Sequence, residues 1–233
     1  MSAARDMSVP FPKSDLPDLA PLINQAVLDA HLDQNTLHEA CDAARHFGLR
    51  GLCTNLTRLP SARKRLGPPG ATKLIAVIAF PFGAIPSNLK LAEAEWAAAE
   101  GAEELEVVPN FLALSESQAE PFAEELSTLC ELGLPVRAIL DMAHLPASNL
   151  PIAIEASIDA GVNGIQTGNG FGPAVTTADV RHVAALANGR CAISAVGGVK
   201  TLGQALELIE AGANILGTSL GLELLQAQRR GNT

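Results

Sequence analysis

The sequence predicts an α/β fold, a single-domain (β/α)8 barrel in which eight parallel strands alternate with helices. From Pro21 onward, short apolar runs alternate with longer amphipathic stretches, as expected when each strand is followed by a helix that returns to a parallel neighbour. A chain of 233 residues suits one domain of this kind. Hydrophobic residues make up 48% of the chain and aromatic residues only 3%, which favours a core of small aliphatic side chains between closely packed helices and strands.

Eight short apolar segments are expected to be the strands, because each is followed by a polar loop and then by a helical pattern. They are residues 23–28, 51–54, 74–80, 104–108, 136–141, 164–167, 192–196 and 215–218. Three helices are marked by glycines that can take the left-handed conformation after the last turn. These helices are residues 35–46, 88–100 and 201–210, followed by Gly48, Gly101 and Gly212.

Residues 1–20 are expected to be a flexible N-terminal arm and residues 21–233 the barrel domain. The arm is rich in proline and charged residues and lacks the apolar segment of an export signal. No run approaches the ~20 apolar residues that span a membrane. Four cysteines without short paired spacing suit a reducing cytoplasm, and the net charge of -9 argues against a nucleic-acid partner.

In such a barrel the working side chains lie at the C-terminal ends of the strands. Polar residues and glycines at the predicted strand ends are therefore the candidates for chemistry. They are Cys53, Asn55, Glu106, Asn110, Arg137, Asp141, Gln166, Thr167, Ser194, Gly197, Gly198 and Ser219. Arg137 is expected to pair with Glu104 or Glu106, and such a pair would lower the pKa of the carboxyl group and make Glu106 a poorer proton donor.

Five segments in order resemble successive motifs of the deoxyribose-phosphate aldolase family, and the resemblance covers about residues 23–225. They are VIAFPFG at 77–83, GAEELEVV at 101–108, QTGNGF at 166–171, GGVKT at 197–201 and LGTS at 216–219. The resemblance implies cleavage of 2-deoxyribose 5-phosphate to glyceraldehyde 3-phosphate and acetaldehyde, without metal or cofactor. In that family a lysine forms an iminium with the substrate, assisted by a second lysine and an aspartate.

This chain departs from the family at each catalytic position. Gln166 stands at the position of the nucleophilic lysine, Ser194 at that of the second lysine, and Glu106 at that of the aspartate. An amide nitrogen has a delocalised lone pair and cannot form the iminium, whereas Glu106 keeps a carboxyl group for proton transfer. In the first strand, Asn24 replaces a family aspartate. The expected consequence is loss of Schiff-base chemistry, unless Lys200 supplies a substitute amine.

The phosphate-binding side of the barrel resembles the family more closely. Backbone N–H groups at Gly170, Gly197, Gly198, Thr218 and Ser219 are expected to bind an anion, although tight loop packing would equally favour small residues there. Pocket residues are expected to include Asn24, Cys53, Asn55, Asp141, Thr167 and Lys200. The spacing of Asp141 and His144, with Glu106 across the barrel, is not a ligand signature, so no metal site is predicted.

Three functions follow from these observations. The leading hypothesis is a divergent family member that binds a small phosphorylated metabolite without Schiff-base activity, as a sensor or partner subunit. The first alternative is a phosphosugar lyase or isomerase that uses Glu106 and Asp141 as acid and base. The second is residual aldolase activity through Lys200, and a scaffold without ligand is also considered.

Homodimers are common in the family, and Trp96 is expected to be a core or interface residue.

Overall fold

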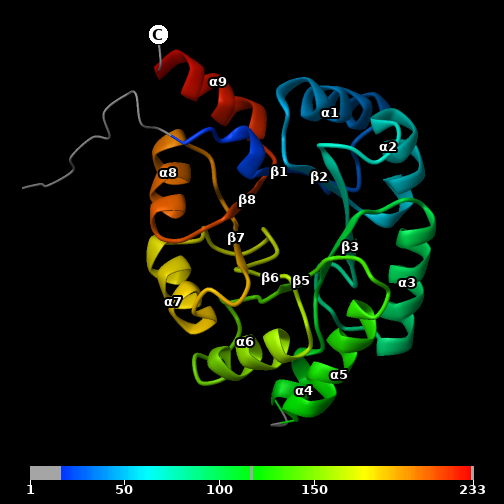
Figure 1. Ribbon diagram of the computed structural model, residues 1–233, viewed down its shortest axis with the longest axis vertical. Helices are drawn as coiled ribbons and strands as arrows, with labels where there is room; N and C mark the ends of the chain where they lie inside the picture. The colour runs from blue at the N-terminus through cyan, green and yellow to red at the C-terminus, as the bar shows by residue number, and fades with distance from the viewer. Residues whose placement is uncertain (1–16, 116–117, 232–233) are drawn as a thin grey trace, which may run out of the picture.

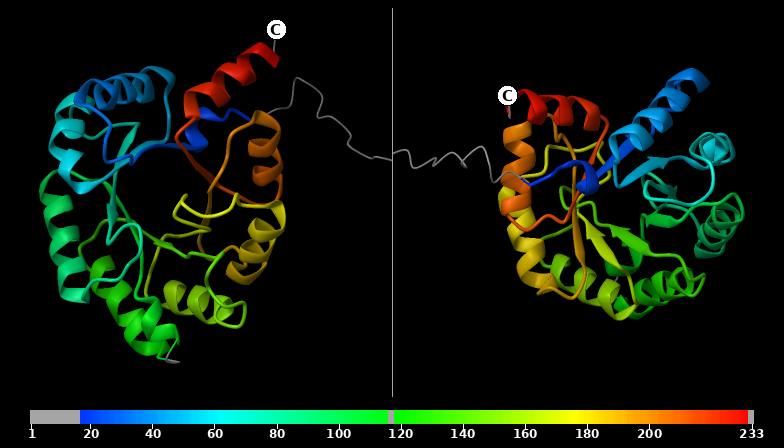
Figure 2. Two further views of the ribbon diagram at one scale, coloured as in Figure 1. Left: turned by 180° about the vertical axis from the view of Figure 1, so that it is seen from behind. Right: turned by 45° about the horizontal axis from the view of Figure 1, so that its top comes forward.

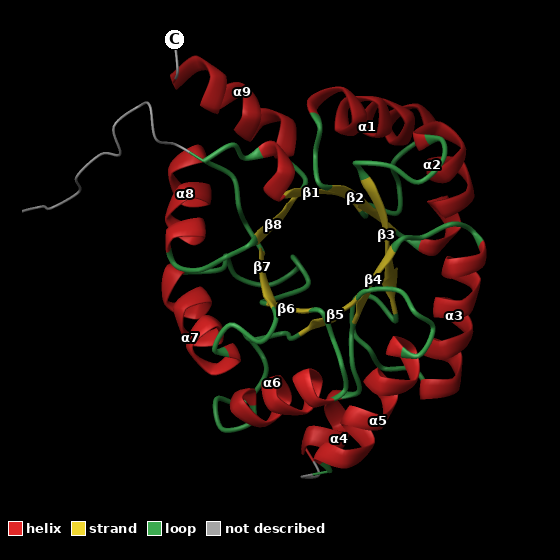
Figure 3. Ribbon diagram, in the orientation of Figure 1, coloured by secondary structure: helices red, strands yellow, loops and turns green. Residues whose placement is uncertain are grey.

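The computed structural model describes residues 17–115 and 118–231 of the chain. Eight parallel strands follow one another around a closed barrel, in which β1 pairs with both β2 and β8. The helices surround this barrel as an outer ring (Figures 1 and 3). The predicted (β/α)8 barrel is confirmed.

All eight predicted strands are present. They are β1 Ile23–Val27, β2 Gly51–Thr54, β3 Lys73–Ile78, β4 Glu104–Val107, β5 Val136–Ile139, β6 Gly164–Gln166, β7 Ala192–Val196 and β8 Ile215–Thr218. Five of them end one or two residues before the predicted boundary, because the chain turns into the loops there. The end of β3 is the clearest case, since Ala79 has a φ of 54°, in the left-handed region, and its N–H donates to Glu93.

The helices begin and end where local sequence signals favour it. They are α1 Gln34–Phe47, α2 Leu59–Leu66, α3 Ser87–Ala99, α4 Phe111–Ser115, α5 Ala119–Cys130, α6 Leu150–Asp159, α7 Thr177–Ala187, α8 Leu202–Glu210 and α9 Gly221–Gly231, with short 3-10 turns η1 Ala20–Leu22 and η2 Leu56–Arg58. Side chains of Asp33, Thr176 and Thr201 accept from backbone N–H groups in the first turns of α1, α7 and α8. Gly48 follows α1 with a φ of 68°, as predicted.

Alternate strand residues face either the helices or the barrel interior. The helix-facing residues form a continuous aliphatic core that includes Leu52, Leu105 and Ile165. The interior holds a separate small cluster of Cys53, Ile75 and Val77. Most of the remaining interior is polar, and its side chains bond across the barrel. Because apolar packing is supplied by the outer layer, the interior can carry groups that do chemistry.

The described N-terminal residues pack against the C-terminal helix α9. Leu19 is fully buried, and the Gln228 side chain donates to Pro17 O at 2.7 Å and accepts from Leu19 N at 3.4 Å. Figure 2 shows this segment beside α9 in two further views. Residues 17–20 of the expected arm thus lie against the barrel's last helix, while residues 1–16 lie outside the described residues. Within the described residues, no helix is long and apolar enough to cross a membrane.

Candidate functional site

A buried carboxyl group, Glu106 on β4, lies at the centre of the interior. Its Oε1 accepts from Asn24 Nδ2 at 3.3 Å, and its Oε2 accepts from Cys53 Sγ at 3.2 Å. Burial raises the pKa of Glu106 above its ordinary value, and the charge of Arg137 opposes this only in part. Burial and the neighbouring carboxyl also raise the pKa of the Cys53 thiol well above its ordinary value. Burial thus shifts the equilibrium of Glu106 toward the protonated form relative to an exposed carboxyl group.

Glu104, two residues earlier on β4, is held by two arginines. Arg50 Nη2 donates to both of its oxygens at 2.7 and 2.9 Å, and Arg137 Nη1 donates to Oε2 at 2.5 Å. Burial alone would raise the pKa of Glu104, but the two guanidinium groups lower it below its ordinary value. Arg137 therefore pairs with Glu104 and not with Glu106. Glu104 is one of the two expected partners of Arg137. The Arg137 charge lowers the pKa of Glu106, as expected, but desolvation outweighs it and the net shift is upward.

Gln166 and Ser194 lie side by side in register on β6 and β7. They are 3% and 1% exposed. Gln166 Nε2 donates to Gly168 O at 2.9 Å, whereas Gln166 Oε1 and Ser194 Oγ are buried without a hydrogen-bond partner. The Gly168 carbonyl can only accept, so it fixes which end of the amide is nitrogen. Neither side chain can form a covalent intermediate with a carbonyl carbon in the way a lysine amine does.

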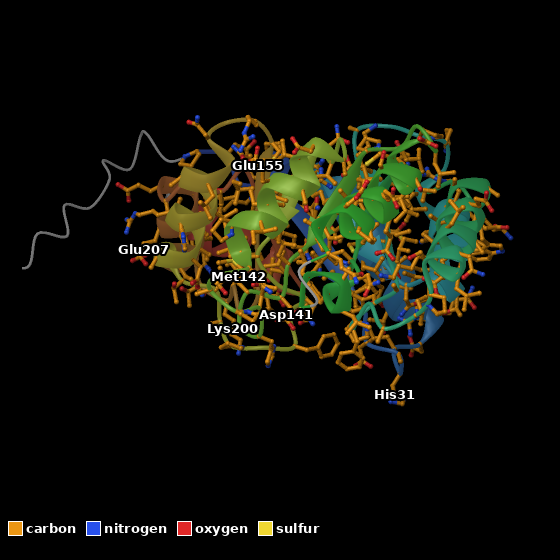
Figure 4. The ribbon with its side chains drawn as sticks, turned by 90° about the horizontal axis from the view of Figure 1, so that it is seen from below. His31, Asp141, Met142, Glu155, Lys200 and Glu207 are labelled. Atoms are coloured by element: carbon orange, nitrogen blue, oxygen red, sulfur yellow. The ribbon has the colours of Figure 1, made fainter. Side chains whose placement is uncertain are left out.

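The described lysines lie outside the interior. Lys64 is exposed on α2, Lys73 pairs with Glu103 at the start of β3, and Lys90 is buried between α3 and α5. Lys200 is exposed after β7, where its backbone N–H donates to Gln204. Figure 4 shows Lys200 and Asp141 along one edge of the molecule. No described lysine therefore takes over the position of the family nucleophile.

A cleft of about 230 Å³ lies beside this interior, between the loops after β5 and β6 and the end of β7. Of the predicted site residues, Asp141, Thr167, Gly170 and Gly197 line it, but Gln166 and Ser194 do not. Thr167 Oγ1 donates to Val196 O at 3.1 Å, so its hydroxyl group joins β6 to β7. The cleft and the polar interior are thus neighbouring compartments that meet at the end of β6.

Other predicted anion contacts have structural roles as well. Thr218 Oγ1 donates to Val199 O at 2.7 Å and accepts from Leu220 N, so the hydroxyl group is occupied. A Cβ atom on Gly198 would lie 2.8 Å from Ala174 Cβ, which explains the glycine by close packing. Ser219 is exposed, and its carbonyl accepts from Gln25. Anion binding by these backbone groups stays a prediction.

The remaining predicted residues lie around the barrel mouth. Asn55 precedes η2 and its side chain accepts from Thr57, and Asp141 pairs with His144 Nδ1 at 2.9 Å. Within the described ranges, no three His, Cys, Asp or Glu side chains gather closely enough to hold a metal ion. Trp96 is 41% exposed on α3, so it is not a core residue.

The sequence analysis missed a buried ion pair beside the site. Lys90 Nζ donates to Glu125 Oε1 at 2.8 Å and to Val108 O at 3.0 Å, and Glu125 Oε1 also accepts from Asn110 N. This pair fixes the chain immediately after β4, which carries Glu106. The sequence did contain a signal for the burial of Lys90, because Lys90 shares a helical face with Ala94 and Ala97, which follow it at positions i+4 and i+7 and are buried. Burial lowers the pKa of Lys90, and Glu125 counteracts this.

Comparison with known proteins places this geometry in a family. No protein-family model matches the chain. The deoxyribose-phosphate aldolase of Thermosynechococcus vestitus is 38% identical over 213 residues, which cover 91% of this chain and 98% of that protein. The chain belongs to the deoxyribose-phosphate aldolase family. The Thermococcus kodakarensis aldolase is 34% identical over 215 residues, covering 90% of this chain and 96% of that protein.

Solved structures of aldolases agree with this family assignment. The aldolase QR15 superposes with a TM-score of 0.87 at 29% identity, covering 92% of this chain and 97% of that chain. The Aeropyrum pernix deoxyribose phosphate aldolase, described as a unique tetramer, superposes with a TM-score of 0.82 at 26% identity over 91% of both chains. The fold of these aldolases is therefore shared by this chain, whose barrel interior carries Gln166 on β6 and Ser194 on β7.

Proposed function

We propose that this chain binds a small phosphorylated metabolite of the deoxyribose 5-phosphate type without forming a Schiff base. The observation that carries the proposal is Gln166, whose amide nitrogen is committed to Gly168 O and which no described lysine replaces. The family membership supports a phosphosugar ligand, because the relatives are named for one. Gly170 and Gly197 in the cleft are the proposed anion contacts. The protein would then act as a sensor or as a partner subunit.

The first test is acetaldehyde release from 2-deoxyribose 5-phosphate by the purified full chain. We expect none from the native protein and a gain from Gln166→Lys. The gain should be larger in Gln166→Lys/Ser194→Lys, because a second cation lowers the pKa of the first amine. Gln34→Lys, an exposed glutamine-to-lysine change on α1, is the matched control and should stay inactive.

Borohydride reduction in the presence of the same sugar phosphate identifies any residual nucleophile. Native activity that disappears in Lys200→Met, together with adduct mass on Lys200, would replace the proposal with an aldolase that uses Lys200. A thermal shift with the sugar phosphate and no acetaldehyde release is the expected result. A flat response to both sugar phosphate and inorganic phosphate would instead favour a scaffold without ligand.

A second candidate function is acid–base catalysis on a phosphosugar, favoured by the raised pKa of Glu106. A buried carboxyl group with a raised pKa is suited to donating a proton during isomerisation or elimination. Asp141, on the cleft, would be the base. Substrate isomerisation followed by proton NMR should then disappear in Glu106→Gln and persist in His144→Gln, which changes only the exposed partner of Asp141.

Self-association is part of the proposal, because one family member is described as a tetramer. Leu89 and Trp96, 49% and 41% exposed on α3, supply apolar surface for such contacts. Light scattering coupled to size exclusion should give a mass of at least two chains. The mass of a single chain at high protein concentration would refute this part.

A further inference from the structure

Two polar side-chain atoms on the adjacent strands β6 and β7 lack hydrogen-bond partners. Gln166 Oε1 and Ser194 Oγ are buried, yet neither has a hydrogen bond, and they do not bond to each other although their residues are in register. More than nine in ten buried polar groups in folded proteins are paired with protein or water. Two such exceptions side by side, at the positions where the family places its reactive amines, indicate a place for a ligand group.

The donor and acceptor character of these atoms restricts that group. Because Gly168 O holds Nε2, the atom left over on Gln166 is a carbonyl oxygen, which can only accept. The Ser194 hydroxyl group can donate or accept. An aldehyde or ketone oxygen has no proton to give, and it would face Gln166 Oε1 with lone pairs. A hydroxyl group can donate to Gln166 Oε1 and accept from Ser194 at the same time.

We infer that this site recognises a hydroxyl group of its ligand, not a free carbonyl group. The inference rests on the proposed function and deepens it, since it assigns the ligand chemistry at the carbon that a lysine would otherwise attack. A phosphorylated sugar alcohol, or a sugar phosphate in its cyclic or hydrated form, presents such a hydroxyl group. No bond forms or breaks in this recognition, so the ligand leaves unchanged.

Calorimetric titration of the full chain tests the inference with two probes that differ at one atom. These are 2-deoxyribitol 5-phosphate and its 1-deoxy-1-fluoro analogue, because fluorine is similar in size to a hydroxyl group but cannot donate. We expect the alcohol to bind about tenfold more tightly to the native protein. In Gln166→Met the ratio should fall to about threefold or less, whereas Gln34→Met should keep the native ratio.

Failures of the two ideas are distinguishable. Equal binding of alcohol and fluoro analogue to the native protein would overturn hydroxyl recognition and leave the phosphosugar proposal standing. Absence of binding by either probe, to the native chain and to both variants, would overturn the proposed function and the inference together. A native preference that survives in Gln166→Met would assign the selectivity to another residue and refute the role of the amide.

A different observation carries a second inference, about access to this interior. The loops after β3 and β6 meet although these strands are not neighbours, and the loop after β6 extends toward the middle of the barrel (Figure 3). The Phe80 and Phe171 rings lie 5.7 Å apart, and Asn169 Nδ2 donates to Pro81 O at 3.2 Å. Asn169 Oδ1 also accepts from Phe171 N, so the asparagine ties both loops together. We name these contacts the loop bridge.

The loop bridge holds Phe80 over the interior. Phe80 packs on the cluster that contains Cys53, whose thiol donates to Glu106. Phe171 is 69% exposed, so its ring adds little buried surface to the bridge, whereas Asn169 is 9% exposed and opening breaks its hydrogen bond to Pro81 O. The geometry points to a latch: the loops part to admit the ligand to Gln166 and Ser194, and they close over it afterwards.

Thiol alkylation measures the opening directly. With iodoacetamide at fixed pH and site-resolved mass spectrometry, Asn169→Ala and Phe171→Ala should increase the modification rate of Cys53 about threefold or more. Cys41, on the buried face of α1, reports global unfolding and should keep its native rate. Phe82→Ala is the matched control, because Phe82 is 76% exposed on the same loop but is not in the bridge.

Unchanged Cys53 rates in both bridge variants would refute the latch. Equal acceleration at Cys41 and Cys53 would also refute it, because that result reports loss of stability and not a local opening. Acceleration by Phe82→Ala to the same extent would show that any change in these loops suffices, and the bridge would lose its assigned role.

Discussion

The Lys90–Glu125 pair, buried between α3 and α5, offers a test of how strongly the stability of the fold depends on one buried ion pair. Lys90 is fully buried, and its amine donates to Glu125 and to Val108 O. In Lys90→Met the side chain is replaced by one of similar length, but Glu125 keeps a buried charge without its cation. Breaking a buried pair in this way costs about 3–5 kcal/mol. For a domain of this size, that corresponds to a melting temperature lower by about 10 °C.

Thermal unfolding followed by circular dichroism measures the effect, with Lys73→Met as the matched control. Lys73 pairs with Glu103 at 3.0 Å, a distance close to that of the buried pair, but its side chain is 41% exposed. Such a pair contributes about 0–1 kcal/mol. Lys90→Met/Glu125→Gln should recover part of the loss, because the amide is neutral and its oxygen can still accept from Asn110 N.

Equal melting temperatures for Lys90→Met and Lys73→Met would refute the reasoning, since they would mean that water reaches Glu125. If Lys90→Met/Glu125→Gln were less stable than Lys90→Met, the expected recovery of stability in the double variant would be refuted. That result would show that the lost hydrogen bonds, and not the unpaired charge, dominate the cost.

Three further predictions concern the carboxyl group, a glycine and a helix cap. The folded pKa of Glu106 is raised above its unfolded value, so its contribution to stability is complete below about pH 4.5 and is lost as the pH rises through the folded value. In urea unfolding, the free energy of unfolding of Glu106→Gln should therefore decrease less over that pH range than that of the native protein. Parallel pH dependences of the two proteins would contradict this prediction. Gly83→Ala should lower the free energy of unfolding by about 2–3 kcal/mol, because Gly83 has a φ of 68° and a Cβ would lie 2.5 Å from a carbonyl oxygen after β4. Gly48→Ala is the control, since Gly48 has the same φ but open space around it, and should cost about 1 kcal/mol. Equal losses of stability in the two variants would show that the clash at Gly83 relaxes. Thr201→Ala should cost about 1 kcal/mol by denaturant unfolding, because Thr201 accepts from Gln204 N at the start of α8, and no loss would mean that water replaces the cap.

Local sequence patterns predicted the order and type of the elements, because each strand and helix of the barrel contacts its neighbours in the chain. The strands at 51–54, 192–196 and 215–218 were placed without error. Differences from the predictions arose where contacts between residues far apart in the sequence determine the local structure. The early end of β3 depends on the Glu93 carboxylate, and the burial of Leu19 depends on Gln228, which is 209 residues away.

For the site, the ordered motifs predicted that Gln166, Ser194 and Glu106 lie on barrel strands, and their positions agree with this. Sequence could not decide which carboxylate Arg137 contacts, because Glu104 and Glu106 project from the same face of β4, two residues apart. Closure of the barrel decides it by bringing Arg50 to Glu104. The donation from Cys53 to Glu106 likewise depends on closure, since β2 and β4 are not adjacent.

The Glu106 side chain accepts hydrogen bonds from Asn24 on β1 and Cys53 on β2, while the Gln166 side chain donates only to Gly168 O, two residues along its own segment. The Glu106 and Gln166 side chains are therefore held by separate sets of hydrogen bonds, although backbone ladders join their strands through β5. One set holds the buried carboxyl group of Glu106, and the other holds the side chain that β6 carries. In such an arrangement the side chain on β6 can change without breaking the hydrogen bonds that hold Glu106. Such modularity makes the chain a natural starting scaffold for installing new chemistry on β6.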